Sequence, residues 1–207
     1  MRILGGSPSV AARDEEINGQ QPRIAPLAED ELSEEAKAYC RELRQTFGIA
    51  ENGAVPEVVA TMLRHPGLYE AQMAIGIQLA AKGAVSGRER ELAVLRGAWL
   101  MGAPYEWGEH VDIAKRFGVS GEEVARIVDG PGAPGWSRHD AALLRAVDEL
   151  LDAYMISDET WATLAESWNE QQLMELPVLV GAYTSIAMQQ NSLRVRRESN
   201  NPGLTHR

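Results

Sequence analysis

The stretch that decides the fold is RERELAVLRGAWLMGAPYEWGEHVDIAKRFG, which spans Arg88 to Gly118. Its first part, up to Met101, is predicted to be a helix, and Gly102 is the kind of residue at which helices commonly end. A second helix is predicted to begin at Pro104, because the fixed backbone angle of proline suits a first helical turn. The stretch therefore predicts two helices joined by a tight corner.

Glu106 and His110 lie four residues apart on the second predicted helix, so their side chains are neighbours on one face. Apolar residues flank the pair on the same face and on the adjoining one, at Ala103, Ile113, Phe117, Trp107, Val111 and Ala114. A partly desolvated carboxylate beside an imidazole is a proton-transfer pair whose pKa values can be tuned towards neutral pH. The same spacing occurs in helix-stabilising pairs without chemistry, and spacing alone does not separate the two interpretations.

Helix start signals recur along the chain and predict an all-α protein. Ser86 and Ser120 each precede a glutamate by three residues, which is the capping-box spacing. The segment 176–195 includes PVLV, which could begin a strand, but its length and the lack of partner strands favour a helix. Residues 1–30 are rich in glycine, proline and charge and are predicted to form an arm, mobile or draped on a partner subunit. Residues 31–207 are predicted to form one all-helical domain.

A further helix is predicted to begin at Pro66, another proline that suits a first turn. Its apolar residues point in most directions around the helix, and they are Leu68, Met73, Ile75, Ile77 and Leu79. A helix that is apolar on most of its surface is typical of a protein interior. We therefore expect this helix to be well buried.

The composition limits the classes of partner. The chain has 207 residues, a formal net charge of −10 and 44% hydrophobic residues. An acidic surface repels phosphate groups, so neither nucleic acid nor an anionic membrane is an expected partner. No segment resembles a membrane span or the apolar core of a secretory signal, so a cytoplasmic location is expected. Cys40 is the single cysteine, which excludes a disulfide within one chain, and it is expected to be a buried small residue.

From Ser86 to Glu123 the sequence resembles the carboxymuconolactone decarboxylase family, which also contains the AhpD-type alkylhydroperoxidases. The resemblance rests on RELAVLR, a helix break, YEWGEH, and an apolar helix that ends in FGVS. It is looser from His65 through the helix that contains LLRAVDELLD. It implies an all-α, AhpD-like helical bundle that assembles as a homotrimer or homohexamer, with 176–195 and the N-terminal arm as interface elements.

In the thiol branch of this family, a CxxC pair stands seven and four residues before a histidine, and a glutamate lies on the preceding helix. In this chain the histidine falls on His110 and the glutamate on Glu91, whereas the two cysteine positions hold Ala103 and Glu106. A thiol-based peroxidase cycle needs a reactive thiolate and a resolving thiol, and neither position supplies one. The resemblance is therefore to the branch without the CxxC pair, with acid–base rather than redox chemistry.

The resemblance implies an enzyme that needs no cofactor: a decarboxylase, another lyase or an isomerase of aromatic catabolism. Its substrate would be a small carboxylated or lactone-like molecule, whose conjugated carbonyl accepts the electrons that the reaction releases. The implied catalytic residues are His110 as the general acid/base, Glu106 as the group that orients or charges it, and Glu91 as a second proton-handling carboxylate.

Three further residues are implied substrate contacts. Arg96 would bind a substrate carboxylate, Tyr105 would donate a hydrogen bond, and Trp107 would form part of the substrate-binding surface. Each has a structural alternative, because arginine on a helix is often solvated and the two aromatic side chains often belong to a core.

Two other functions stay open at this point. One is an AhpD-like peroxidase or antioxidant protein, for which Cys40 would be the single thiol. The other is a non-catalytic, ligand-binding relative that has kept the helical assembly. A metal site is not expected, because the sequence has no HExxH and no paired ExxH motif.

Overall fold

The computed structural model describes residues 9–47 and 55–207, and it contains helices but no strand within those ranges. The helices, in chain order, are α1 Val10–Asn18, η1 Glu29–Glu31, α2 Glu34–Phe47, α3 Glu57–Met62, α4 Pro66–Ala81, α5 Gly87–Met101, α6 Pro104–Arg116, α7 Gly121–Asp129, α8 Arg138–Ala153, α9 Asp158–Ala165, α10 Glu170–Leu193 and η2 Gly203–Thr205. The all-α prediction is confirmed.

The helix boundaries follow the capping residues in the sequence. Ser86 and Ser120 both form the capping boxes that their spacing predicts, and Pro66 and Pro104 occupy the first turns of α4 and α6. The segment 176–195 lies mostly in α10, as predicted. This helix begins earlier than the apolar run, because Asn169 caps it, and it continues through an internal proline.

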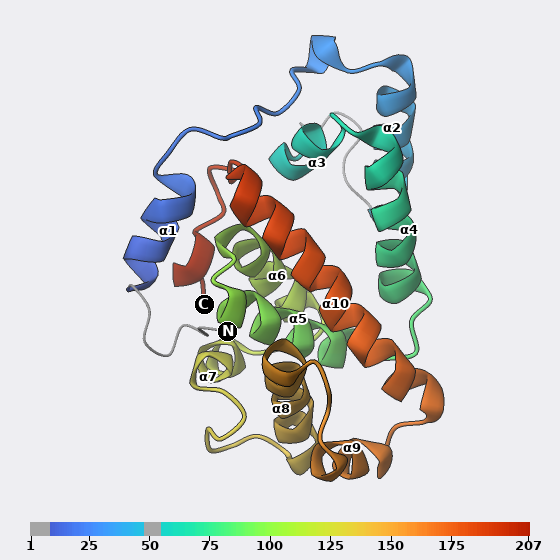
Figure 1. Cartoon of the computed structure of the whole chain (residues 1–207), viewed down its shortest axis with the longest axis vertical. Helices are drawn as coiled ribbons and strands as arrows, with labels where there is room; N and C mark the ends of the chain where they lie inside the picture. The colour runs from blue at the N-terminus through green and yellow to red at the C-terminus, as the bar shows by residue number, and fades with distance from the viewer. Residues whose placement is uncertain (1–8, 48–54) are drawn as a thin grey trace.

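The main core is built around α5, which packs against α6, α8 and α10. In Figure 1 the long helix α10 crosses in front of α5 and α6, with α7, α8 and α9 at one end of the molecule. Ten residues of α5 are buried, and the core also takes in large side chains of the other helices, such as Trp107, Leu143 and Leu176. This core fixes the corner between α5 and α6.

A second, smaller cluster joins α2, α3 and α4 at one side of α10. Its buried members are Leu32, Ala36, Cys40, Met62, Leu63 and Tyr69. The expectation that the helix after Pro66 is well buried is wrong: Tyr69 and Leu79 are the buried residues of α4, and Leu68 and Ile75 are exposed. Its neighbours cover only part of a helix that is apolar nearly all round.

The predicted N-terminal arm is helical over α1, because the Ser9 side chain accepts a hydrogen bond from the Ala12 N–H and caps the helix. This helix contacts the chain's own residues: Arg13 Nε donates to the Gly102 carbonyl at 3.2 Å, and Arg197 pairs with Asp14 at 2.8 Å. Residues 1–8 of the predicted arm lie outside the described ranges. The division of the chain into an arm, residues 1–30, and one domain, residues 31–207, stays a prediction.

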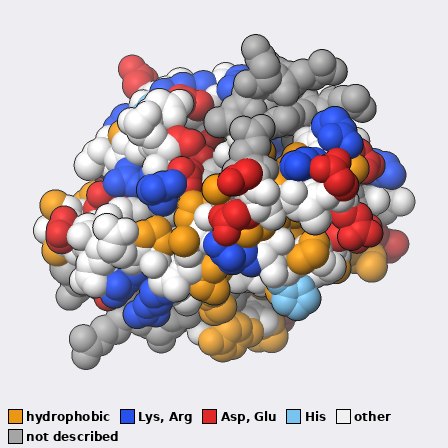
Figure 2. Space-filling model, turned by 90° about the horizontal axis from the view of Figure 1, so that it is seen from above, with side chains coloured by type: hydrophobic (Ala, Val, Ile, Leu, Met, Phe, Trp, Pro, Cys, Tyr) orange, Lys and Arg blue, Asp and Glu red, His pale blue; other side chains and the backbone are white. Residues whose placement is uncertain are grey.

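Positive and negative side chains are interspersed over the face of the molecule shown in Figure 2, with hydrophobic side chains between them. Within the described ranges, no helix combines the length and the apolar character needed to cross a membrane.

Candidate active site

The corner between α5 and α6 places the predicted catalytic residues opposite one another. Gly102 ends α5 in the left-handed backbone region, with φ of 55°, which glycine adopts without steric strain. Two residues later Pro104 begins α6. The chain therefore turns back at once, and Glu91 on α5 meets His110 on α6.

His110 lies between two carboxylates. Its Nδ1 is 2.7 Å from Glu91 Oε2, and its Nε2 is 3.0 Å from Glu106 Oε1. The other oxygens of the two carboxylates are also hydrogen-bonded: Arg90 Nε donates to Glu91 Oε1 at 3.0 Å, and Gln190 Nε2 donates to Glu106 Oε2 at 2.7 Å. All five side chains belong to buried residues. They form one continuous chain of polar groups, which we call the Arg90–Gln190 chain.

The pKa values of the central pair move in opposite directions. Burial alone would lower the pKa of His110, but Tyr183, Glu91 and Glu106 outweigh burial and raise this pKa well above its ordinary value of 6.5. Burial alone would raise the pKa of Glu91, but His110 and Arg90 hold it below its ordinary value of 4.5. At neutral pH the geometry is thus that of an imidazolium that donates one N–H to each carboxylate.

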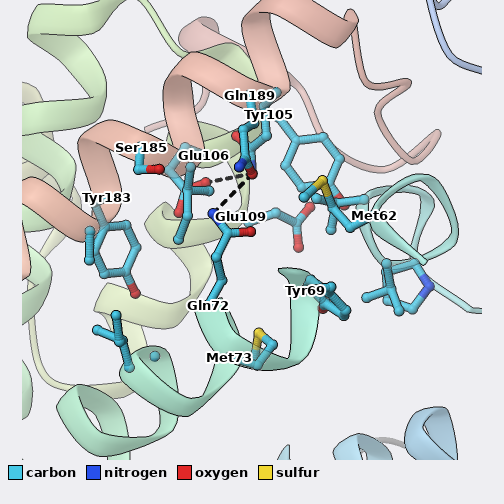
Figure 3. A pocket seen from close by; sticks show the side chains of 18 of the residues that line it. Met62, Tyr69, Gln72, Met73, Tyr105, Glu106, Glu109, Tyr183, Ser185 and Gln189 are labelled. Carbon is cyan, nitrogen blue, oxygen red and sulfur yellow. Dashed lines mark hydrogen bonds between the residues drawn. The ribbon is translucent and has the colours of Figure 1, made fainter. Parts of the chain in front are cut away.

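A cavity of about 370 Å³ lies beside this chain, between α3 and α4 on one side and α6 and α10 on the other. Figure 3 shows Tyr105, Glu106 and Glu109 of α6 and Tyr183 of α10 around it. The residues that line it are Pro56, Val58, Val59, Met62, Tyr69, Gln72, Met73, Ile75, Gly76, Leu79, Ala80, Tyr105, Glu106, Glu109, His110, Ala182, Tyr183, Ser185, Ile186, Gln189 and Gln190. Most of them are apolar, and none of these lining residues is a lysine or an arginine.

The sequence-predicted residues Glu91, Glu106, His110 and Tyr105 come together at this place. Glu91 lies behind His110, whereas the other three line the cavity. The Tyr105 hydroxyl donates to Glu198 Oε1 at 2.9 Å, so within this chain it holds a segment that follows α10. The role of each residue in a reaction stays a prediction.

Arg96 lies away from the cavity beside His110, so its role as the ligand of a substrate carboxylate stays a prediction. Its Nε and Nη2 form a two-pronged ion pair with Asp148, at 2.6 and 2.9 Å, and its Nη1 donates to the Ile127 carbonyl at 2.8 Å. Arg96 is buried and does not line the cavity. Its guanidinium therefore ties α5 to α7 and α8.

Trp107 is also absent from the cavity lining, and its part in substrate binding likewise stays a prediction. Its side chain is fully buried, and its indole N–H donates to the His206 carbonyl at 3.1 Å. The ring packs against Trp99, with centroids 5.1 Å apart. Trp107 therefore belongs to the main core, on the side of α6 that faces His206.

The cavity residues that were not predicted from the sequence include Tyr183, Gln190 and Glu109. The Tyr183 ring meets His110 edge to face, with centroids 5.1 Å apart, and burial raises the pKa of its hydroxyl. Tyr183 and Gln190 are seven residues apart on α10, which is two helical turns, so they share one face. That spacing indicates in the sequence that Tyr183 and Gln190 lie on one face of a helix. It does not indicate that this face packs against α6.

Glu109 lines the cavity beside Glu106 and is exposed. Asn201 Nδ2 donates to its Oε1 at 2.7 Å. Partial loss of solvent raises the pKa of Glu109, and the nearby Glu198 adds to this effect, although Asn201 opposes it. Glu109 is thus a cavity carboxyl whose pKa is raised above its ordinary value.

Cys40 lies in the smaller cluster and not in the cavity lining. Among the residues that the structure describes, no group of three or more His, Cys, Asp or Glu side chains is arranged to hold a metal ion. The groups that face the cavity are therefore those of acid–base chemistry and hydrogen bonding.

Residues 66–149 match the family model described as the carboxymuconolactone decarboxylase family. The chain also resembles several solved structures. A peroxidase-related protein from Ralstonia eutropha JMP134, described as an alkylhydroperoxidase AhpD core, is 16% identical and has a TM-score of 0.73; the match covers 86% of this chain and 93% of that one. The debrominase Bmp8, in complex with 2,3,4-tribromopyrrole, is 16% identical with a TM-score of 0.70, over 86% of this chain and 92% of that one.

A third structure, from Agrobacterium tumefaciens, is a protein of unknown function described as a candidate AhpD antioxidant defence protein. It is 19% identical with a TM-score of 0.61, over 66% of this chain and 94% of its own. No curated protein sequence matches the chain significantly. At such identities the structural likenesses show the fold alone, which is AhpD-like. The chain is therefore similar to the carboxymuconolactone decarboxylase family over residues 66–149, and it has Ala103 and Glu106 at the two CxxC positions.

Proposed function

We propose that this protein is an enzyme that needs no cofactor, a lyase or isomerase that moves a proton on a small and largely apolar carbonyl compound such as an unsaturated lactone. The observation that carries the proposal is the position of His110 between Glu91 and Glu106, at 2.7 and 3.0 Å, with Glu106 lining the cavity. A buried carboxylate with a charged imidazole behind it is suited to proton transfer.

The geometry supports roles that differ from those inferred from the sequence. Both ring nitrogens of His110 are engaged by carboxylates, and Glu106 is the carboxylate that faces the cavity. In the proposed mechanism Glu106 exchanges the proton with the substrate, and His110 supplies or stores that proton through its Nε2–H. Glu91 and Arg90 hold the imidazole in place and stabilise its charge.

An isomerisation of this kind needs two proton transfers and no net change of charge. Glu106 removes a proton from the carbon next to the carbonyl group, and the electron pair of the broken C–H bond moves onto the carbonyl oxygen. The Tyr183 hydroxyl is a cavity donor for the oxygen that becomes negative. Return of the proton to another carbon of the conjugated system completes the reaction.

The decarboxylase version of the proposal uses the same acid–base pair, but its substrate carries a carboxylate. No lysine or arginine lines the cavity, and Arg96 is engaged elsewhere. A desolvated carboxylate without a cationic partner is costly to bind. This observation favours lactone isomerisation over decarboxylation.

The test uses proton exchange at carbon. The protein is incubated in D2O with a series of unsaturated γ-lactones, with and without a carboxyl substituent, and deuterium uptake at carbon is followed by NMR. We expect Glu106→Gln to slow exchange about 100- to 10,000-fold, the usual contribution of a general acid or base. Glu122→Gln, the same change at an exposed position on α7, is the matched control and should leave the rate unchanged.

Full exchange activity in Glu106→Gln would overturn the assignment. Binding of the lactones without any exchange would instead support the non-catalytic, ligand-binding alternative. The AhpD-like peroxidase alternative gains no support from the cavity, because its lining contains no thiol.

Assembly as a homotrimer or homohexamer also stays a proposal, and the expected homo-oligomer is checked by light scattering. A mass near 22.7 kDa would contradict it. The exposed apolar residues of α4 and α10, among them Ile75, Val178 and Met188, support the proposal, since such surfaces often mark interfaces.

A further inference from the structure

The Arg90–Gln190 chain has a direction, and it ends at an atom without a partner. Arg90 and His110 donate to Glu91, and His110 and Gln190 donate to Glu106. At the Gln190 end of the chain, Oε1 is buried and has no hydrogen-bond partner among the described residues. Gln190 is 4% exposed and lines the cavity.

The orientation of the Gln190 amide follows from its neighbour. Glu106 Oε1 already accepts from His110 Nε2, and a carboxylate oxygen can only accept from an amide, so the NH2 group of Gln190 must face Glu106 Oε2. The carbonyl oxygen of the amide is then turned away from Glu106. A flip of the amide would place two acceptors against each other at 2.7 Å and is therefore unfavourable.

A buried carbonyl oxygen without a partner costs free energy, and a ligand with an O–H or N–H group in the cavity would remove that cost. The charged groups around the cavity limit the class of ligand further. The Arg90–Gln190 chain contains two positive groups, Arg90 and His110, and two negative groups, Glu91 and Glu106, and the cavity lining adds no lysine or arginine. The site therefore offers nothing that would neutralise an anion.

From these observations we infer that the substrate is an uncharged molecule that carries a hydroxyl or N–H group, and that Gln190 is the residue that recognises this group through Oε1. The inference rests on the proposed function only in taking this cavity as the substrate site. It replaces the carboxylated substrate, which the sequence implied, by a neutral hydrogen-bond donor such as an enol, a hydroxylactone or a phenol.

The test measures binding and not turnover, with three small aromatic probes of similar size: 4-propylphenol, 4-propyltoluene and 4-propylbenzoate. Dissociation constants are measured by titration calorimetry for the unchanged protein, for Gln190→Met and for the matched control Gln171→Met. Gln171 is an exposed glutamine on the same helix, α10, and it does not line the cavity.

We expect the preference for the phenol over the toluene to fall about five- to tenfold in Gln190→Met, the value of one neutral hydrogen bond, and to be kept in Gln171→Met. The benzoate should bind more weakly than the phenol to the unchanged protein. A crystal structure of the phenol complex should place the hydroxyl within hydrogen-bond distance of Gln190 Oε1, which tests the inference even if the variant does not fold.

An unchanged preference in Gln190→Met, a phenol hydroxyl bound elsewhere, or tighter binding of the benzoate would each overturn the inference. The proposed function fails separately: full proton exchange in Glu106→Gln would remove the catalytic role of Glu106 and leave the ligand preference in place. The two results are therefore distinguishable.

Discussion

Helices α4 and α5 are similar in length, with 16 and 15 residues, but they are used in opposite ways. The apolar helix α4 has two buried residues. Helix α5 has ten, and two arginines and a glutamate are among them. In these two helices, burial thus follows position in the fold and not hydrophobicity. The polar groups of α5 are buried because partners across the core satisfy them, and α4 is left as one wall of a cavity.

The difference has a physical consequence for the site. The groups proposed for chemistry lie on α5, α6 and α10, which pack against one another in the main core. The wall opposite them belongs to α3 and α4, which are held by a small cluster and by the bond from Gln72 to Gln189. Rigid elements keep reacting groups in place, and weakly packed elements are the ones that open most easily.

The largest expected effect is on stability, and it comes from truncating a leucine in the main core rather than on α4. Leu143→Ala removes a fully buried side chain of the main core and should lower the free energy of unfolding by about 2–5 kcal/mol. Leu68→Ala makes the same change on α4, where the side chain is 43% exposed, and should cost about 0.5 kcal/mol or less. Urea unfolding checks both values, and similar losses in the two variants would contradict the contrast.

The next prediction concerns the pH dependence of stability, which should come from the core. The lowered pKa of Glu91 contributes stability above its ordinary value of 4.5, and this contribution is lost as the pH falls through the folded-state pKa. The raised pKa of His110 contributes stability that is complete below its ordinary value of 6.5 and is lost as the pH rises through the folded-state pKa. The pair should therefore stabilise the protein most between about pH 4.5 and 6.5.

This pH dependence is measured as the melting temperature of the unchanged protein and of His110→Gln from acid to alkaline pH. The difference between the two curves should be largest in that window and shrink on both sides. The exposed pair of Arg138 and Glu166 is the control, because its replacement should leave the shape of the curve unchanged. A difference that does not vary with pH would exclude the pair as its source.

The smallest effect concerns the contact between α4 and α10. Gln72→Leu removes the hydrogen bond to Gln189 Oε1 and should cost about 0.5–1.5 kcal/mol of local stability. Amide hydrogen exchange should become faster in α4 and stay unchanged in α5. Equal acceleration in both helices would show that α4 opens only when the whole protein unfolds.

The sequence predicts the helices well where the signals are local. The capping boxes of Ser86 and Ser120 and the proline at the start of α6 depend on neighbours within a few residues, and all three are confirmed. Local sequence signals do not predict which residues far apart in the chain will be in contact. Arg96 was expected at the site, but its partner Asp148 lies 52 residues away, and nothing local to Arg96 indicates that ion pair.

The same reasoning explains which part of the site was foreseen. The spacing of Glu106 and His110 is local, and the family resemblance added Glu91. The contributions of α10 were missed because the two-turn spacing of Tyr183 and Gln190 shows a shared face but not what that face meets. The burial of α4 was overestimated because an apolar helix surface does not reveal whether enough neighbours cover it.

The arrangement around His110 also sets a direction for the movement of protons. At the Arg90 end of the chain the guanidinium does not give up its proton in proteins, so that end is closed. At the other end Gln190 donates to Glu106 but does not ionise, and Glu106 is the chain's carboxylate that faces the cavity. In the proposed reaction, His110 can therefore exchange its proton with the substrate only through Glu106. Each turnover must give that proton back to His110 before the next turnover can begin.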